Sequence, residues 1–327
     1  MATRRLLPGF VALCLGAVLA RGFATTVGFN HLLLAIALGF VVTNTVGVPA
    51  RLEPGIATHK LWLGAGIVLM GASISVDTVL EVGGPVFALV IAVAALSVLV
   101  VELLARTAFD LPERLGSLLA AGTGICGVSA VVAVAGAVRA REEQIAYAAA
   151  TVLLFDAITI VVYPIVGDVL ALSGTVFGVW AGVSMFSTGP VVAVGFAHSD
   201  VAGQWATMTK LSRNALIGVV VIAYASYYAR AGTGSRPSVR TLWDEFPKFV
   251  LGFLALAVVA SAGVLSATQQ ASLENASNWL FLLAFVGLGT EIRLADLRDT
   301  GPVPAVVVLL ALLVSSAVSL GVLLLVF

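Results

Sequence analysis

Long apolar runs follow one another along almost the whole chain, and they constrain the fold more than any other feature. A spanning helix needs roughly 20 apolar residues to cross a hydrocarbon core about 30 Å thick. Only helices and closed barrels satisfy their backbone polar groups in lipid, and the runs lack the two-residue alternation of barrel strands. The sequence therefore predicts an all-α polytopic membrane protein with about ten or eleven transmembrane helices. The runs cover 6–27, 30–50, 61–79, 84–105, 115–138, 144–166, 175–197, 207–229, 249–267, 277–293 and 302–327.

The charge content excludes several functions. Only 10 % of the residues are charged and 60 % are hydrophobic, and 17 basic residues cancel 17 acidic ones. No basic patch of the kind that binds nucleic acid is present, so the lipid bilayer is the expected partner and nucleic acid is not. The runs leave only short connections. We therefore expect residues 1–327 to form a single integral membrane transporter domain, with no separate catalytic domain.

The residues that support catalysis or metal binding are scattered. His31, His59 and His198 have no metal-ligand spacing. No nucleophile elbow, zinc-protease motif or phosphate-binding loop occurs. We therefore expect no enzyme activity, no catalytic residues, no metal and no cofactor.

Basic residues gather in loops that fall on one side of an eleven-span topology. Because cytoplasmic loops carry an excess of Lys and Arg, this pattern predicts a plasma-membrane protein with a cytoplasmic N-terminus. Arg139 and Arg141 lie on the same side as the other basic residues only if run 115–138 enters the membrane and returns. Whether runs 115–138 and 175–197 cross the membrane or re-enter it stays open, and so does whether the protein forms a homodimer. The basic residues are Arg4, Arg5, Arg51, Lys60, Arg106, Arg114, Arg230, Arg236, Arg240, Lys248, Arg293 and Arg298.

Two internal similarities indicate duplication, which is common in transporters as inverted repeats. One has an offset of about 218 residues and the other an offset of about 60. We expect repeat halves of about 28–167 and 168–327. In an eleven-span count the second similarity joins parallel segments, so one inverted duplication does not explain both. The first pairs Gly71 with Gly289, Ile74 with Ile292 and Gly83 with Gly301, and the second pairs Gly122 with Gly182 and 131–134 with 191–194.

Two glycine-rich stretches, 122–130 and 182–190, are expected to interrupt helices at membrane depth. Glycine loosens a helix, and Pro190 removes a backbone donor from the second stretch. A broken helix exposes backbone N–H groups and the positive end of its dipole, which together suit an anion. The alternative is close helix packing through small residues, or a simple proline kink. The predicted substrate-binding residues here are Thr123, Gly124, Cys126, Gly127 and Ser129 in the first stretch and Ser187, Thr188 and Gly189 in the second.

Three ionisable residues lie inside apolar runs, where such groups are costly and often functional. Lys210 and Arg213 lie three apart, on one helical face, and are predicted to neutralise a bound anion. The alternative is that they snorkel to the headgroups. Asp156 is predicted to couple transport to a proton or a sodium ion, and a salt bridge with one of the two cations is the alternative.

The two interrupted stretches resemble the YeiH-type sulfate exporter family. Its glycine-rich break is matched by Gly122-Thr-Gly-Ile-Cys-Gly127, and its second motif by residues 180–192. The resemblance continues through 206–213 and 287–292. It implies a secondary transporter related in fold to bile-acid transporters and sodium/proton antiporters, with inverted repeats and two interrupted helices that cross near the midplane.

The chain departs from the family pattern at the presumed site. Phe186 and Ser187 stand where the family has a His and an acidic residue, and Asp156 stands where many relatives have a small residue. The leading prediction is a secondary active transporter of a small anion, sulfate-like or sulfonate-like, that works by alternating access. The alternatives are a sodium- or proton-coupled organic-acid carrier and a passive anion channel.

Overall fold

The computed structural model describes residues 2–74, 76–230, 247–295 and 301–326. Most of these residues lie in helices, and no strand occurs among them. The predicted all-α polytopic membrane fold is therefore confirmed. Arg236, Arg240 and Arg298 lie outside the described residues. Among the described residues, 6 helices are long and apolar enough to cross a membrane: Arg5–Thr26, Glu53–Ser73, Gly83–Ala108, Glu142–Val169, Asp200–Arg230 and Pro302–Val326.

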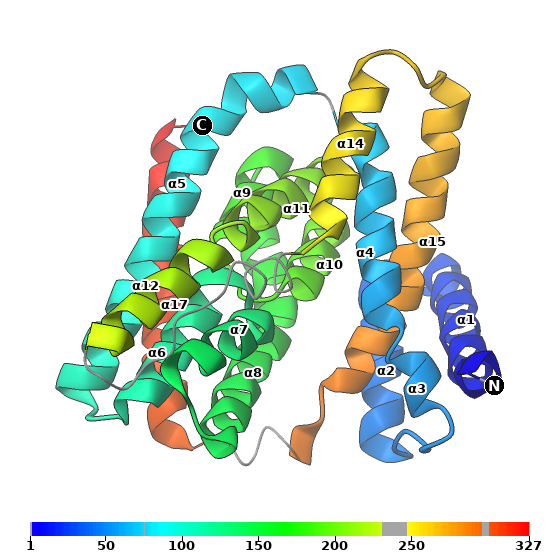
Figure 1. Ribbon diagram of the computed structural model, residues 1–327. Coiled ribbons are helices and arrows are strands. Elements are labelled where there is room, and N and C mark those ends of the chain that lie inside the picture. The colour runs from blue at the N-terminus through cyan, green and yellow to red at the C-terminus, as the bar shows by residue number, and fades with distance from the viewer. Residues whose placement is uncertain (1, 75, 231–246, 296–300, 327) are drawn as a thin grey trace. The chain divides into compact units, whose positions relative to one another are not determined.

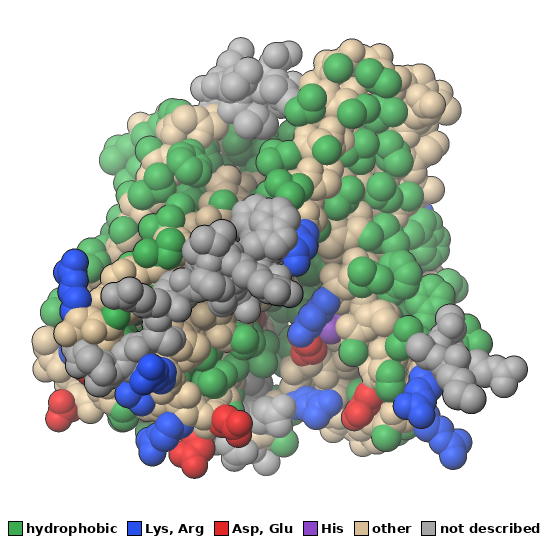
Figure 2. Space-filling view, viewed as in Figure 1, with side chains coloured by type: hydrophobic (Ala, Val, Ile, Leu, Met, Phe, Trp, Pro, Cys, Tyr) green, Lys and Arg blue, Asp and Glu red, His purple; other side chains and the backbone are tan. Residues whose placement is uncertain are grey.

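The chain divides into two compact units, and each draws on two separate parts of the sequence. Unit 1 contains Met1–Gly83 and Lys248–Leu294, and unit 2 contains Gly84–Pro247 and Ala295–Phe327. Apolar side chains dominate the visible face of each unit taken by itself (Figure 2). Large apolar side chains exposed in this way suit a lipid surround. The extent of the predicted repeat halves, 28–167 and 168–327, stays a prediction.

Unit 1 is built from helices whose ends follow local sequence signals. Asn30 caps α2, because its side chain accepts hydrogen bonds from the N–H groups of Leu32 and Leu33. Ser266 and Gln269 form a capping box at the start of α15. The helices are α1 (Ala2–Val27), α2 (His31–Thr45), α3 (Glu53–Ile56), α4 (His59–Met70) with the 3₁₀ turn η1 (Gly71–Ser73), α14 (Phe249–Ser261) and α15 (Ala267–Glu291).

The glycines of the 218-residue offset have matching surroundings in unit 1. A Cβ added to Gly71 would lie 2.5 Å from the carbonyl oxygen of Phe253 on α14. A Cβ added to Gly289 would lie 2.1 Å from the carbonyl oxygen of Ile36 on α2. Each glycine therefore lets its helix approach the backbone of a partner helix, and the two partners are themselves related by the same offset.

The isoleucines of the same offset also match. Ile74 and Ile292 each follow a helix end, and their N–H groups donate to Gly71 and Gly289 at 3.3 Å. The carbonyl of Ile292 accepts from Asn44 on α2 at 2.8 Å, and that of Ile74 accepts from Ser261 on α14 at 3.5 Å. Figure 1 shows α4 and α15 running in opposite directions. These contacts agree with an inverted relation between the two segments.

Unit 2 holds both interrupted stretches. Its helices are α5 (Val76–Leu103), most of which belongs to this unit, with the π-helical turn η2 (Leu104–Ala108), α6 (Glu113–Ala121) with the π-helical turn η3 (Gly122–Cys126), α7 (Val128–Val138), α8 (Glu142–Val169), α9 (Gly174–Ser184), α10 (Thr188–His198), α11 (Asp200–Asn214), α12 (Ile217–Arg230) and α17 (Pro302–Val326). The hydroxyls of Ser97 on α5 and Ser315 on α17 are hydrogen-bonded at 2.8 Å. These serines are also 218 residues apart, so two equivalent positions contact each other, as residues on a two-fold axis do.

We expect Gly289→Ala to destabilise the protein, because the added methyl group would overlap the α2 backbone. The overlap forces a backbone shift, which costs about 1–3 kcal/mol. Gly321→Ala is the matched control, because no atom lies within 4 Å of the added Cβ there. The apparent midpoint of thermal unfolding in detergent should fall for the first variant only. Equal midpoints for the two variants would contradict the close approach of α15 to α2.

Candidate functional site

Each interrupted stretch folds back on itself as a helical hairpin. In hairpin 1 (113–139), the Arg114 guanidinium near the start of α6 donates to the carbonyl of Arg139, just beyond α7, at 2.9 Å. In hairpin 2 (173–199), Phe177 of α9 stacks on His198 of α10 with ring centroids 4.1 Å apart. Both ends of each stretch therefore lie together at its base. The expectation that the two interrupted helices cross is not met, because each chain segment reverses at its break.

The reversals occur where the backbone leaves helical geometry. Gly127 precedes α7 with φ +73°, a conformation that favours glycine. Met185 and Ser187, between α9 and α10, are both extended. The two hairpins follow the 60-residue offset, since Val128–Val138 and Thr188–His198 each contain 11 residues.

The tips of the two hairpins meet. A Cβ added to Gly127 would lie 2.1 Å from the Ser187 hydroxyl oxygen. The 28 residues of α8 connect the base of hairpin 1 to the base of hairpin 2, a length of about 42 Å. The hairpins therefore start at opposite ends of α8 and point toward each other. The 60-residue repeat is therefore inverted as well. The sequence predicted parallel segments because each interrupted stretch was counted as a full membrane span.

Two cations of α11 bind the carbonyl ends of both hairpins. Lys210 and Arg213 are completely buried. The carbonyl end of a helix carries a partial negative charge and unsatisfied acceptors, so a cation stabilises it. The Lys210 ammonium donates to Ile125 at 2.8 Å and Met185 at 3.1 Å, and the Arg213 guanidinium donates to Gly124 at 2.6 Å, Val183 at 2.7 Å, Met185 at 2.9 Å and also Thr123.

These contacts change how the two cations act. Neither side chain snorkels, because both are enclosed by the hairpin tips. Their donors engage backbone carbonyls of η3, of α9 and of Met185 just after α9, so they neutralise the ends of broken helices. Direct contact of Lys210 or Arg213 with an anion stays a prediction.

Asp156 of α8 lies at the amide end of hairpin 2. Its carboxylate accepts a hydrogen bond at 3.0 Å from the N–H of Ser187, the residue that precedes α10. The Asp156 side chain is almost fully buried, with 3 % exposure. A carboxylate suits this place because the N-terminus of a helix carries a partial positive charge. The chain's own anion therefore occupies one of the two amide ends at the tips.

At the amide end of hairpin 1, the N–H that corresponds to that of Ser187 belongs to Gly127, and it donates to the Gly122 carbonyl at 2.9 Å. Gly127 carries no side chain, and among the described residues no hydrogen bond is made by the N–H groups of Val128 or Ser129. Val128 is partly exposed and Ser129 is exposed. This end therefore offers backbone donors to a ligand.

The structure brings the predicted residues together at the tips, with different roles. The hydroxyl of Thr123 donates back to the Leu119 carbonyl at 2.9 Å, so it is no free donor. Thr188 accepts a hydrogen bond at 3.0 Å from Asn214, which the sequence analysis missed. Asn214 directly follows Arg213 on α11, and that position was the available signal. Gly124, Cys126 and Gly189 are buried.

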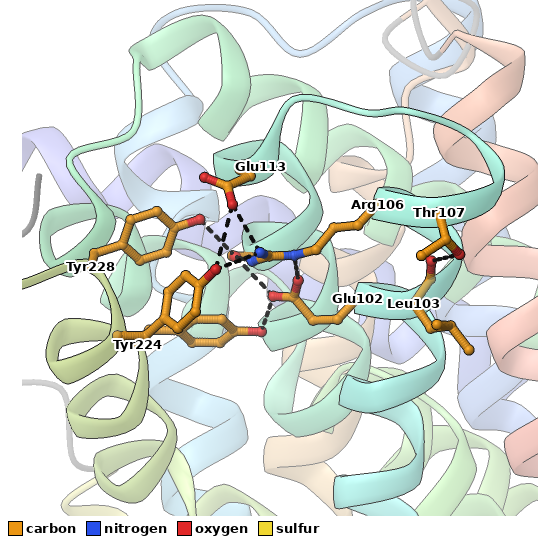
Figure 3. Close-up of polar contacts among 9 residues, drawn as sticks. Glu102, Leu103, Arg106, Thr107, Glu113, Tyr224 and Tyr228 are labelled. Carbon is orange, nitrogen blue, oxygen red and sulfur yellow. Dashed lines mark hydrogen bonds and ion pairs between the residues drawn. The ribbon is translucent and has the colours of Figure 1, made fainter. Parts of the chain in front are cut away.

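A second polar cluster holds the base of hairpin 1 (Figure 3). The Glu102 carboxylate of α5 accepts from Arg106 at 2.5 Å, from Ser117 of α6 at 2.8 Å and from Tyr224 of α12 at 2.7 Å. Arg106 also donates to Glu113 at 2.9 Å. The cluster joins α5, hairpin 1 and α12 through one partly buried carboxylate, and no sequence pattern predicts it because Tyr224 is 122 residues from Glu102.

Comparisons with known proteins agree with a membrane protein. The model of a family described as "Conserved hypothetical protein 698" matches residues 6–308. Similar relatives are each named "UPF0324 membrane protein". That of Nitratidesulfovibrio vulgaris is 34 % identical over 90 % of this chain and 86 % of its own. That of Clostridium tetani is 30 % identical over 83 % and 82 %, and that of Agrobacterium fabrum 28 % over 98 % and 93 %. No solved structure matches this chain.

We expect Arg213→Lys to lower stability strongly. A lysine ammonium cannot reach all four carbonyls that the guanidinium binds, and each buried acceptor left unsatisfied costs about 1–3 kcal/mol. Arg230→Lys, at the exposed end of α12, is the control. Thermal unfolding in detergent should show a large fall in the midpoint for Arg213→Lys alone. If both variants kept the wild-type midpoint, the carbonyl contacts would not be stabilising.

Glu102→Gln should loosen the base of hairpin 1. The amide replaces one acceptor oxygen with a donor that faces other donors, which costs about 1–3 kcal/mol. Glu142→Gln makes the same change at an exposed position in the first turn of α8. Limited proteolysis of the loops next to hairpin 1 should be faster for Glu102→Gln only. Unchanged cleavage in that variant would show that the cluster does not hold the hairpin.

Proposed function

The chain belongs to the family described as "Conserved hypothetical protein 698", and on that premise we propose that it is a secondary active transporter that moves a small anion by alternating access. The observation that carries the proposal is the meeting of two hairpin tips, where the N–H groups of Val128 and Ser129 make no hydrogen bond among the described residues. Non-helical backbone at membrane depth is tolerated where it is enclosed by protein or lines a cavity. In many transporters built from inverted repeats, the substrate binds where the helices are broken.

The charges at the tips favour an anion. Lys210 and Arg213 contribute two positive charges and Asp156 one negative charge, which leaves a net charge of +1 among three buried side chains. The carbonyl ends of both hairpins are occupied by the cations. An anion at Val128 and Ser129 would accept backbone hydrogen bonds and complete the charge balance. We assign the substrate to the small oxyanions, sulfate-like or sulfonate-like, and the resemblance to the YeiH-type sulfate exporters supports that class.

The proposed orientation of the chain in the membrane follows from the return of hairpin 1 to its starting side. When residues 113–139 return to the side from which they start, Arg139 and Arg141 join Arg106 and Arg114 on one side. Cytoplasmic loops carry such an excess of basic residues. We therefore propose a plasma-membrane location with a cytoplasmic N-terminus, and a proton or a sodium ion as the coupling ion.

Anion counterflow in proteoliposomes tests the function. We expect saturable exchange of sulfate or methanesulfonate, measured with and without imposed proton and sodium gradients. Val128→Pro should reduce exchange by about tenfold or more, because proline fits the first position of a helix yet removes one hydrogen-bond donor to a charged ligand. Ala267→Pro makes the same change at the first position of α15, an exposed site, and should leave exchange unaltered.

Three other outcomes would overturn the proposal. Flux that rises linearly with concentration, without counterflow, would indicate a passive anion channel. Exchange of organic acids alone would indicate an organic-acid carrier. No flux of any anion by protein with a normal thermal transition would exclude anion transport.

A further inference from the structure

The amide ends of the two hairpins differ in one respect. Asp156 of α8 fills the end of hairpin 2 through its hydrogen bond to Ser187. The 60-residue offset relates α8 to the segment formed by α11 and α12, and the position that corresponds to Asp156 is Leu216. One copy of the repeat therefore supplies a carboxylate to the hairpin tip, and the other copy supplies a leucine.

The carboxylate of Asp156 indicates what the amide end of hairpin 1 can hold. It is a small oxyanion with one negative charge, and it is bound at a broken-helix N-terminus in the same chain. The residue equivalent to Ser187 in the other repeat is Gly127, whose N–H donates to the Gly122 carbonyl at 2.9 Å. The N–H groups of the next two residues, Val128 and Ser129, make no hydrogen bond within the described residues. A ligand that resembles the Asp156 carboxylate in charge and size is therefore suited to these two N–H groups.

The buried charges also limit the charge of the ligand. Lys210 and Arg213 are 0 % exposed and Asp156 is 3 % exposed, and their formal charges sum to +1. A singly charged anion would bring this group to neutrality. A doubly charged anion would leave the group with one uncompensated negative charge, which is unfavourable beside buried side chains.

We infer that Asp156 sets the charge of the transported anion, so that the wild-type site selects a singly charged oxyanion over a doubly charged one. This inference rests on the proposed function and names the substrate class within it. Asp156 acts here as a specificity-determining residue through its fixed charge. A coupling role would instead change the dependence of transport on protons or sodium.

Asp156→Asn tests the inference with little change in shape. The amide oxygen still accepts a hydrogen bond from Ser187, and the net charge of the buried group rises from +1 to +2. Sulfate and methanesulfonate are the probes, because they share sulfur–oxygen chemistry and differ by one charge. We expect the wild type to prefer methanesulfonate in counterflow. The ratio of sulfate to methanesulfonate exchange should rise at least about tenfold in Asp156→Asn, because one elementary charge within about 12 Å, at an effective dielectric constant near 20, changes the ratio by that much or more.

Asp168→Asn is the matched control. Asp168 lies on the same helix with 79 % of its side chain exposed, so the same loss of charge should leave the exchange ratio unchanged. Asp156→Ser provides a second variant that removes the charge and keeps a short polar side chain. The thermal shift that each anion causes in detergent measures the same preference without transport.

The outcomes separate this inference from the proposed function. Saturable exchange with a ratio unaltered in both Asp156 variants, or with a wild-type preference for sulfate, overturns the charge selection alone. An unaltered ratio with loss of proton or sodium dependence assigns Asp156 to coupling and also overturns it. No exchange and no thermal shift with either anion, in a folded wild type, overturns the transport proposal and this inference with it.

Discussion

The binding of Lys210 and Arg213 to backbone carbonyls is the interaction on which unit 2 depends. A helix that ends inside a membrane leaves acceptors that neither lipid nor water satisfies. Both hairpins end in this way, and both meet the same two side chains of α11. Burial of two cations would be costly without partners, and broken helices would be costly without cations. Each feature therefore accounts for the other.

Glycine provides the second requirement, because charges and carbonyls interact at these distances only when helices approach closely. A Cβ added to Gly178 would lie 2.4 Å from the Ala202 carbonyl oxygen, and one added to Gly182 would lie 2.6 Å from Thr209. α9 thus lies almost directly on the backbone of α11. Glycine allows the same close approach in unit 1, at Gly71 against α14 and at Gly289 against α2.

The sequence predicted the helical class, the two interruptions and the residues at the tips, since apolar runs, glycines, Pro190 and buried charges all leave marks in a sequence. It did not predict that the interrupted segments return, because a crossing segment and a returning one have the same apolar composition. It also did not predict that Lys210 and Arg213 bind backbone carbonyls such as those of Gly124 and Met185, because a backbone carbonyl has no side-chain signature. Glu102 meets Tyr224 across 122 residues, a separation over which local patterns carry no information.

The contact of Gly127 with Ser187 also ties the two hairpin tips to each other. These residues correspond in the 60-residue offset, and the Ser187 hydroxyl occupies the space that a side chain at position 127 would need. A side chain there would also have to adopt φ +73°. Position 127 is therefore constrained twice, by its own backbone and by its counterpart in the other repeat.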